Sequence, residues 1–191
     1  MLNRPATRQH AISLAIHMRD ELPILVEKEP GPDTPSGRTK WTRAVWQYFD
    51  EHYRNARNWD MYPKTKPMKG RVAGEFMTDF ALFDGRGYRI ACESQWGESL
   101  ESIDWAFDKL RSVKAEIKLL IFERKHEAEP RLPEDVEKMV KGYLAESGNH
   151  HAEHEFYLFL QFSGSHAKLF IWEPKMLDGY TAESIQIELI P

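Results

Sequence analysis

The stretch Phe76 to Trp96, FMTDFALFDGRGYRIACESQW, decides the fold of this chain. It contains two runs of β-forming residues on either side of Gly85-Arg86-Gly87. A short connection that carries glycine between two such runs is typical of an antiparallel hairpin. The stretch therefore predicts two adjacent, paired strands.

The loop also predicts which residues of the hairpin oppose each other. If Asp84 and Tyr88 close the loop, Asp79 faces Glu93 across the two strands. Opposed side chains lie about 4.5–5.5 Å apart at Cβ, close enough for two carboxylates to reach one cation. Because side chains alternate along a strand, Gln95 follows Glu93 on the same face. The same count pairs two further positions: Ala81 with Ala91 and Phe83 with Arg89.

Length and composition bound the class of protein. The chain has 191 residues, of which 41% are hydrophobic, so it can build a full core. No apolar run approaches the roughly 18 residues of a membrane span, and the N-terminal MLNRPATRQH lacks the apolar segment of a signal peptide. We therefore expect no membrane partner and a cytoplasmic protein. The single Cys92 excludes an internal disulfide, and its strand face, opposite that of Glu93, predicts a packing role.

Positive charge is concentrated in one segment. The formal net charge is −4, yet residues 36–71 carry nine Lys or Arg against three acidic residues. Such asymmetry permits a phosphate-facing surface, although basic clusters also occur as plain solvated surface. We predict that nucleic acid contacts residues 54–71, through five cations: Arg57, Lys64, Lys66, Lys69 and Arg71. In the alternative interpretation, the loop 58–71 is irregular and its Trp59 and Tyr62 pin it to the core.

Periodicity and breakers predict the remaining elements. Before the hairpin we expect helix 8–22 ended by Pro23, a Pro-rich hinge at 29–36, helix 34–56, and a first core strand within 59–62 or 69–75. After it we expect helix 100–114, strand 115–123 parallel to part of the hairpin, helix 132–147, a second hairpin from 155–162 and 167–172, and strand 184–190. The domain organisation is an N-terminal helix and hinge over 1–33, followed by one domain over 34–191.

Histidines are predicted to serve packing or turns. His52 lies on the apolar face of its helix, and no second His or Cys follows at the spacing that shares a metal. His150, His151 and His154 fall in a turn and lack the spacing of a zinc site. The run 156–162 is apolar on both faces, so it is either central in the sheet or part of a homodimer interface.

The order helix, hairpin with D…E-x-Q, helix and strand resembles the PD-(D/E)XK nuclease superfamily, over roughly residues 36–124. The resemblance implies an α/β (α+β) fold with the restriction-endonuclease-like core α-β-β-β-α-β, a mixed central sheet, an N-terminal helix and a C-terminal strand extension. It also implies that Asp79 and Glu93 bind Mg²⁺ or Mn²⁺, with the Ser94 carbonyl as a further ligand.

One position departs from the family pattern. The third motif residue is usually Lys, and here it is Gln95, which can neither act as a base nor supply positive charge. In some members the Lys has moved to the following helix, so we expect Lys109 to provide that charge. The upstream accessory acid of the family is matched by Glu51 or its neighbour Asp50, or by Glu75.

The implied function is metal-dependent hydrolysis of phosphodiester bonds in DNA or RNA, with Asp79, Glu93, Gln95 and Lys109 as catalytic residues. Two alternatives stay open: an inactive nuclease-fold module that binds nucleic acid or protein, and a homodimeric interaction protein. A plainer interpretation pairs the two carboxylates with surface cations, namely Arg89, Lys109 or Lys118.

Overall fold

The computed structural model describes residues 8–29, 37–67, 77–96, 99–123, 138–139, 142, 155–163, 166–172, 176–177 and 181–182. Its helical elements are α1 (Arg8–Lys28), α2 (Gly37–Phe49), the π-helical η1 (Asp50–Asn55) and α3 (Leu100–Ser112). Its strands are β1 (Asp60–Tyr62), β2 (Phe80–Phe83), β3 (Tyr88–Gln95), β4 (Ile117–Glu123), β5 (Phe156–Ser163), β6 (His166–Trp172), β7 (Met176–Leu177) and β8 (Thr181–Ala182). The α+β class predicted from the sequence is confirmed.

A mixed sheet organises the described residues. Six strands lie in the order β1-β2-β3-β4-β5-β6. The first three form an antiparallel meander, β4 and β5 follow in parallel with β3, and β6 returns antiparallel to β5. The parallel placement of β4 against β3 confirms that α3 is a crossover helix. The run 156–162 is central in this sheet, because β5 lies between β4 and β6.

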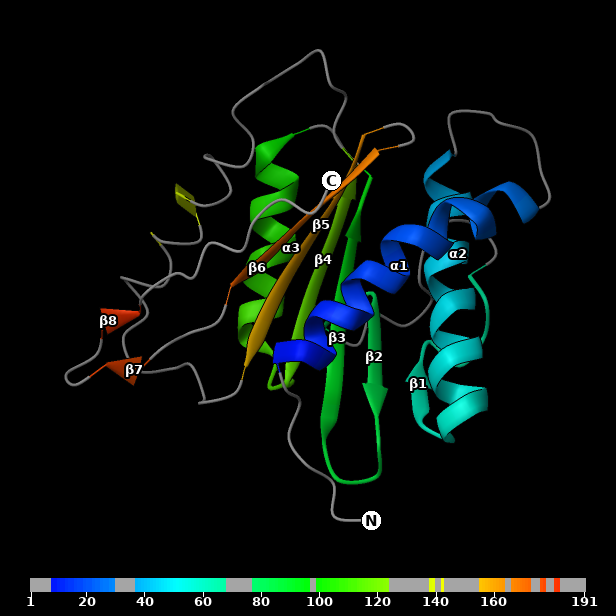
Figure 1. Ribbon diagram of the computed structural model, residues 1–191, viewed down its shortest axis with the longest axis horizontal. Coiled ribbons are helices and arrows are strands. Elements are labelled where there is room, and N and C mark those ends of the chain that lie inside the picture. The colour runs from blue at the N-terminus through cyan, green and yellow to red at the C-terminus, as the bar shows by residue number, and fades with distance from the viewer. Residues whose placement is uncertain are drawn as a thin grey trace.

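Helices cover both faces of the sheet (Figure 1). On one face α1, which crosses in front of the sheet in Figure 1, packs with α2 against residues such as Phe80, Cys92 and Ile121. On the other face α3 packs through Phe107 and Leu110 against Ala91 and its neighbours. Strand alternation makes these two cores, since consecutive residues of β3 and β4 point to opposite helices. Cys92 is fully buried, as predicted.

One boundary prediction is wrong, and one change of helix type was not predicted. Helix α1 does not end at Pro23 but continues to Lys28, with Pro23 inside it. Proline removes one helical hydrogen bond, yet Leu22 and Leu25 on either side of it are buried in the core, and this packing holds the chain helical. The described part of the second helix changes from α2 to π-helix at Asp50, a change that the apolar periodicity did not predict.

The hairpin register is correct over most of its length. Ala81 pairs with Ala91 as predicted, but Phe83 pairs with Tyr88 and not with Arg89. A register shift between Leu82 and Phe83 absorbs one residue, as β-bulges beside turns do. Of the two segments considered for the first core strand, β1 lies in 59–62. The segment 69–75, the hinge from 30 to 36 and strand 184–190 lie outside the described residues, as does most of helix 132–147.

Within the described ranges, no helix is long and apolar enough to cross a membrane.

Candidate functional site

The predicted opposition of Asp79 and Glu93 is present at the open end of the hairpin. Asp79 lies one residue before β2, and its backbone N–H donates to Glu93 Oε1 at 3.0 Å. Its own carboxylate Oδ2 accepts two hydrogen bonds from Ser94, from the backbone N at 2.8 Å and from Oγ at 2.9 Å. Each carboxylate is thus fixed by the opposite strand, which holds the pair rigidly together.

Lys109 completes this cluster from the helical layer. Its Nζ lies 2.7 Å from Glu93 Oε2, and the Glu93 side chain is 0% exposed whereas that of Lys109 is 22% exposed. Ser99 caps the start of helix α3, and its Oγ accepts a hydrogen bond from the Ser102 N–H at 3.2 Å. The capped helix packs on the same face of β3 to which Glu93 points, and this brings Lys109 over the carboxylate.

The Glu93 carboxyl has an unusual protonation equilibrium. Burial, and then the negative charge of Asp79, raise its pKa to about 8, although Lys109 and the Asp79 N–H act in the opposite direction. One ammonium group therefore does not offset the loss of water around this carboxyl. A buried acid with a strongly perturbed pKa beside a second acid and a cation has the character of a functional centre.

Gln95 lies on the predicted face, next to an open groove. The residue is half-buried, and the groove of about 550 Å³ is lined by Gln95 and by residues of α3 or its cap: Ser99, Glu101, Ser102, Asp104, Trp105 and Asp108. Trp105 is 66% exposed. The groove therefore presents an aromatic ring and three carboxylates next to Gln95, which lies two residues after Glu93. Such a lining favours cations over bare phosphate.

The two other cations considered for this centre are engaged elsewhere. Arg89 donates to Asp84 at 2.7 Å and forms an ion pair with Glu116, at the turn end of the hairpin. Lys118 is buried and contacts Glu155 at 2.8 Å. Of the three cations, Lys109 alone is described in contact with Glu93.

The structure does not bring Glu51 or Asp50 into this centre. Glu51 is exposed on η1 and accepts a hydrogen bond from Gln47. Asp50 forms an ion pair with Arg54 in the same helical segment. Among the described residues, neither joins Asp79 and Glu93 in a set of three potential ligand atoms within 4.8 Å. Glu75 lies outside the described residues.

The predicted nucleic-acid surface is partly occupied by internal contacts. Arg57 lies over the rings of Tyr53 and Trp59, at 5.0 and 5.6 Å from their centroids. Trp59 packs against the core, as the alternative interpretation expected. Lys64 lies 5.8 Å over the ring of Tyr62, which is 44% exposed.

Lys66 is the remaining described cation of this surface. Lys66 forms an ion pair with the buried Glu29 and donates to Gln47 at 3.0 Å. The ammonium group of Lys66 therefore has internal partners, although Glu29 also forms an ion pair with Arg43. Lys69 and Arg71 lie outside the described residues.

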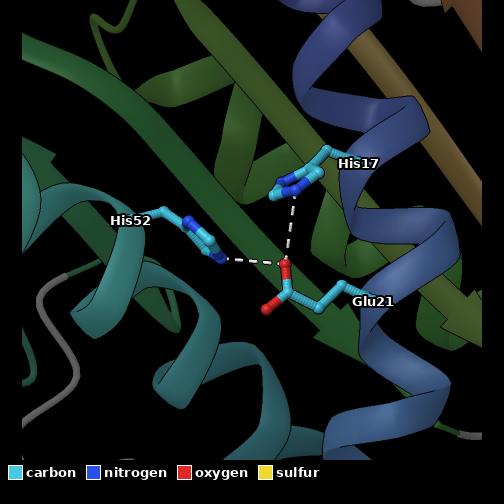
Figure 2. A group of neighbouring side chains, drawn as sticks. All are labelled: His17, Glu21 and His52. Carbon is cyan, nitrogen blue, oxygen red and sulfur yellow. Dashed lines mark hydrogen bonds and ion pairs between the residues drawn. The ribbon is translucent and has the colours of Figure 1, made fainter.

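Sequence spacing missed one cluster. His52 was predicted to be a hydrogen-bonded packing residue, and its Nε2 does contact Glu21 at 2.8 Å. A second histidine, His17, lies beside the same carboxylate from another helix, so His17, Glu21 and His52 form a compact group (Figure 2). Glu21 and His52 are 31 residues apart in the sequence, so no local motif predicts their contact. His150, His151 and His154 lie outside the described residues.

Comparison of the chain with protein-family models, with curated proteins and with solved structures gives no match.

Proposed function

We propose that this protein is a metal-dependent phosphodiesterase of the PD-(D/E)XK type, acting on nucleic acid at Asp79, Glu93, Gln95 and Lys109. One observation carries the proposal: the fully buried Glu93 accepts a hydrogen bond from the Asp79 backbone N–H and contacts Lys109 Nζ, so that the two acids and the cation assigned to one centre by the family pattern lie together. These three residues come from a loop, a strand and a helix, so their convergence is a property of the fold.

The order of elements supports a restriction-endonuclease-like core. From α2 through β1, β2, β3 and α3 to β4 the chain follows α-β-β-β-α-β, interrupted by η1 alone among the described elements. Asp79 lies immediately before the second strand of this order, Glu93 lies on the third strand, and Lys109 lies on the crossover helix. A chance acidic pair on a hairpin has no reason to meet a cation from the next helix.

The donor set fits a hard divalent cation. Carboxylate oxygens are the ligands that Mg²⁺ and Mn²⁺ take up, and Mg²⁺ is commonly held by one or two carboxylates. Asp79 is half-buried, so it links the buried Glu93 to solvent. When bound between Asp79 and Glu93, the ion would lower the pKa of a water ligand and offset charge on the phosphate.

The chain's own residues have distinct roles in this proposal. Ser94 holds the Asp79 carboxylate in place through its two hydrogen bonds. The Gln95 amide, on the same face as Glu93, donates and accepts hydrogen bonds and so orients the attacking water. Lys109, with its side chain partly exposed, stabilises negative charge that develops on the phosphate.

The groove next to Gln95 sets a condition on the substrate. Its carboxylates repel a polyanion, so we infer that the nucleic acid enters productively when a divalent cation is bound. Arg57, which lies over Tyr53 and Trp59, and Lys64, which lies over the exposed Tyr62, provide the described part of the phosphate-contacting surface. Metal binding is therefore the first property to measure.

The test combines a Mn²⁺ titration with plasmid nicking in Mg²⁺. We expect the wild-type protein to bind Mn²⁺ and to nick supercoiled plasmid, and Asp79→Ala and Glu93→Ala to lose both. Glu27→Gln, which removes an exposed acid of α1 outside the groove, serves as the control and keeps both. A plasmid that stays intact with the wild type, together with Mn²⁺ binding unaffected by Glu93→Ala, would overturn the proposal.

A second function, a nuclease-fold binding module without catalysis, is favoured by Gln95 and by the Glu93–Lys109 ion pair. In that case Lys109 takes the place of the metal. The Lys109→Ala variant separates the two functions. If the protein is an enzyme, Lys109→Ala keeps Mn²⁺ binding and loses plasmid nicking. If it is a binding module, the wild type neither binds Mn²⁺ nor nicks plasmid, and Lys109→Ala gains Mn²⁺ binding because the acids lose their internal cation.

A further inference from the structure

Two helices meet at the group formed by His17, Glu21 and His52, on the side of the sheet away from Glu93. His17 and Glu21 lie one turn apart on α1, so their side chains share one face. His52 comes from η1, and π-helical turns recur at functional sites. Figure 2 shows the Glu21 carboxylate between the two imidazoles, with a dashed contact to each.

The three ligand atoms converge at the spacing that a transition metal requires. Glu21 Oε2 lies 2.8 Å from His52 Nε2 and 3.6 Å from His17 Nε2, and one ligand atom from each residue lies within 4.8 Å of the others. A tetrahedral zinc ion with bonds of about 2.0–2.2 Å holds its ligand atoms about 3.4 Å apart. Small side-chain rotations therefore place all three atoms on one ion.

A buried tyrosine orients one of the imidazoles. His17 Nδ1 lies 2.9 Å from the hydroxyl of Tyr48, which is 1% exposed. Metal-binding histidines almost always hydrogen-bond through the other ring nitrogen, which fixes the tautomer and aims the ligating atom. Here that bond leaves His17 Nε2 directed at Glu21, while the rings of Tyr48 and His52 pack with centroids 4.7 Å apart.

The surroundings allow an ion to enter and to keep a water ligand. The side chains of His17, Glu21 and His52 are 56%, 24% and 35% exposed. Two imidazoles with one carboxylate suit Zn²⁺ and neighbouring transition metals, whereas Mg²⁺ and Ca²⁺ prefer sites made of oxygen alone. Three protein ligands with an open fourth position is the arrangement of catalytic zinc sites.

We propose that His17 Nε2, Glu21 Oε2 and His52 Nε2 form a Zn²⁺ site that joins α1 to η1, separate from the carboxylate centre at Asp79 and Glu93. The site has an open coordination position for water or another small ligand. Zinc there cross-links two helices that belong to one core, so it also stabilises the folded chain.

The test uses Co²⁺ as a spectroscopic substitute for Zn²⁺ with the full-length protein. We expect one equivalent of Co²⁺ to give the intense visible bands of four- or five-fold coordination, and Zn²⁺ to abolish those bands; Co²⁺ at the carboxylate centre would give only the weak bands of six-fold coordination. His17→Gln, Glu21→Gln and His52→Gln each weaken Co²⁺ binding by more than about 10-fold, and Tyr48→Phe weakens it by roughly 10-fold.

Controls separate this site from the other candidate ligands. His10→Gln on the same helix, Glu93→Gln, and the triple variant His150→Gln, His151→Gln and His154→Gln all keep the Co²⁺ spectrum. Circular dichroism of each variant verifies folding; if His52→Gln does not fold, the exposed His17 provides the equivalent variant. A spectrum unchanged in both His17→Gln and Glu21→Gln, or one of purely six-fold coordination, would overturn the proposal.

Discussion

Glu93 is the residue at which stability and chemistry oppose each other. It is fully buried, it meets Asp79, and its single described counter-charge is Lys109. A buried pair of this kind adds little stability compared with apolar packing, because desolvation offsets the attraction. The position is therefore better explained by a use for the carboxylate than by its contribution to folding.

The raised pKa of Glu93 leads to a prediction about stability in the absence of metal. Folded Glu93 keeps its proton up to about pH 8, whereas the ordinary value for glutamate is 4.5. Between these values the folded state binds more protons than the unfolded state, so stability falls as pH rises through this window. In EDTA, we expect Glu93→Gln to be increasingly more stable relative to wild type from pH 5 to pH 8, measured by urea denaturation.

The control for this measurement is Glu101→Gln, an exposed acid on the first turn of α3. Its stability should follow the pH dependence of the wild type. If the difference between Glu93→Gln and wild type were the same at pH 5 and pH 8, the raised pKa would be refuted.

At the scale of the element, helix α1 contains a proline that lowers the stability of its backbone. Pro23 is half-buried inside the helix, between the buried Leu22 and the exposed Ile24. An interior proline costs a helix about 3 kcal/mol through the lost hydrogen bond and the clash with the preceding turn. The buried side chains of α1 hold the helix together across it.

Replacing this proline should stabilise the protein. We expect Pro23→Ala to raise the free energy of unfolding by about 1–2 kcal/mol, since the restored hydrogen bond exceeds the added entropy of the unfolded chain. Thermal denaturation followed by circular dichroism measures the effect, and Ile24→Ala on the exposed side of the helix is the comparison. An equal or lower melting temperature for Pro23→Ala would show that α1 is kinked to accommodate the ring.

For the whole molecule, the N-terminal helix is part of the main core. Leu14, Met18 and Leu22 of α1 are buried in the same cluster as residues of α2 and of strands β2 to β5. The two candidate metal centres lie on opposite faces of this one sheet, one under α3 and the other between α1 and η1. Loss of α1 would expose an apolar face of the sheet as well as remove two of the three proposed zinc ligands.

A truncated chain tests this unity. We expect residues 34–191 alone to lose cooperative unfolding and to bind the dye ANS, because the core face that α1 covers becomes exposed to water. Differential scanning calorimetry beside the full-length protein measures the change. A sharp transition in the truncated chain, with the heat per residue of the full chain, would mean that α1 is an independent appendage.

The sequence determined the local part of this fold. Alternation and the Gly-bearing loop were enough to place Ala81 opposite Ala91, and with them Asp79 beside Glu93. They failed at Phe83, where the bulge depends on how the turn is bonded: Asp84 accepts from the N–H groups of Arg86 and Gly87. Helix α3 and the position of its Lys109 could also be predicted from the sequence, because a helix that follows a strand packs back on it.

Tertiary structure alone decided the rest. Glu93 could be placed on a face by counting, but its complete burial, and with it the raised pKa, depends on how closely α3 packs on β3. The sequence predicted Lys66 to be a phosphate ligand, whereas in the folded chain Lys66 forms an ion pair with the distant Glu29. His52 had no ligand at helical spacing, because its partners His17 and Glu21 lie on another helix. Periodicity reports which face a residue occupies; only the meeting of distant segments determines what stands opposite it.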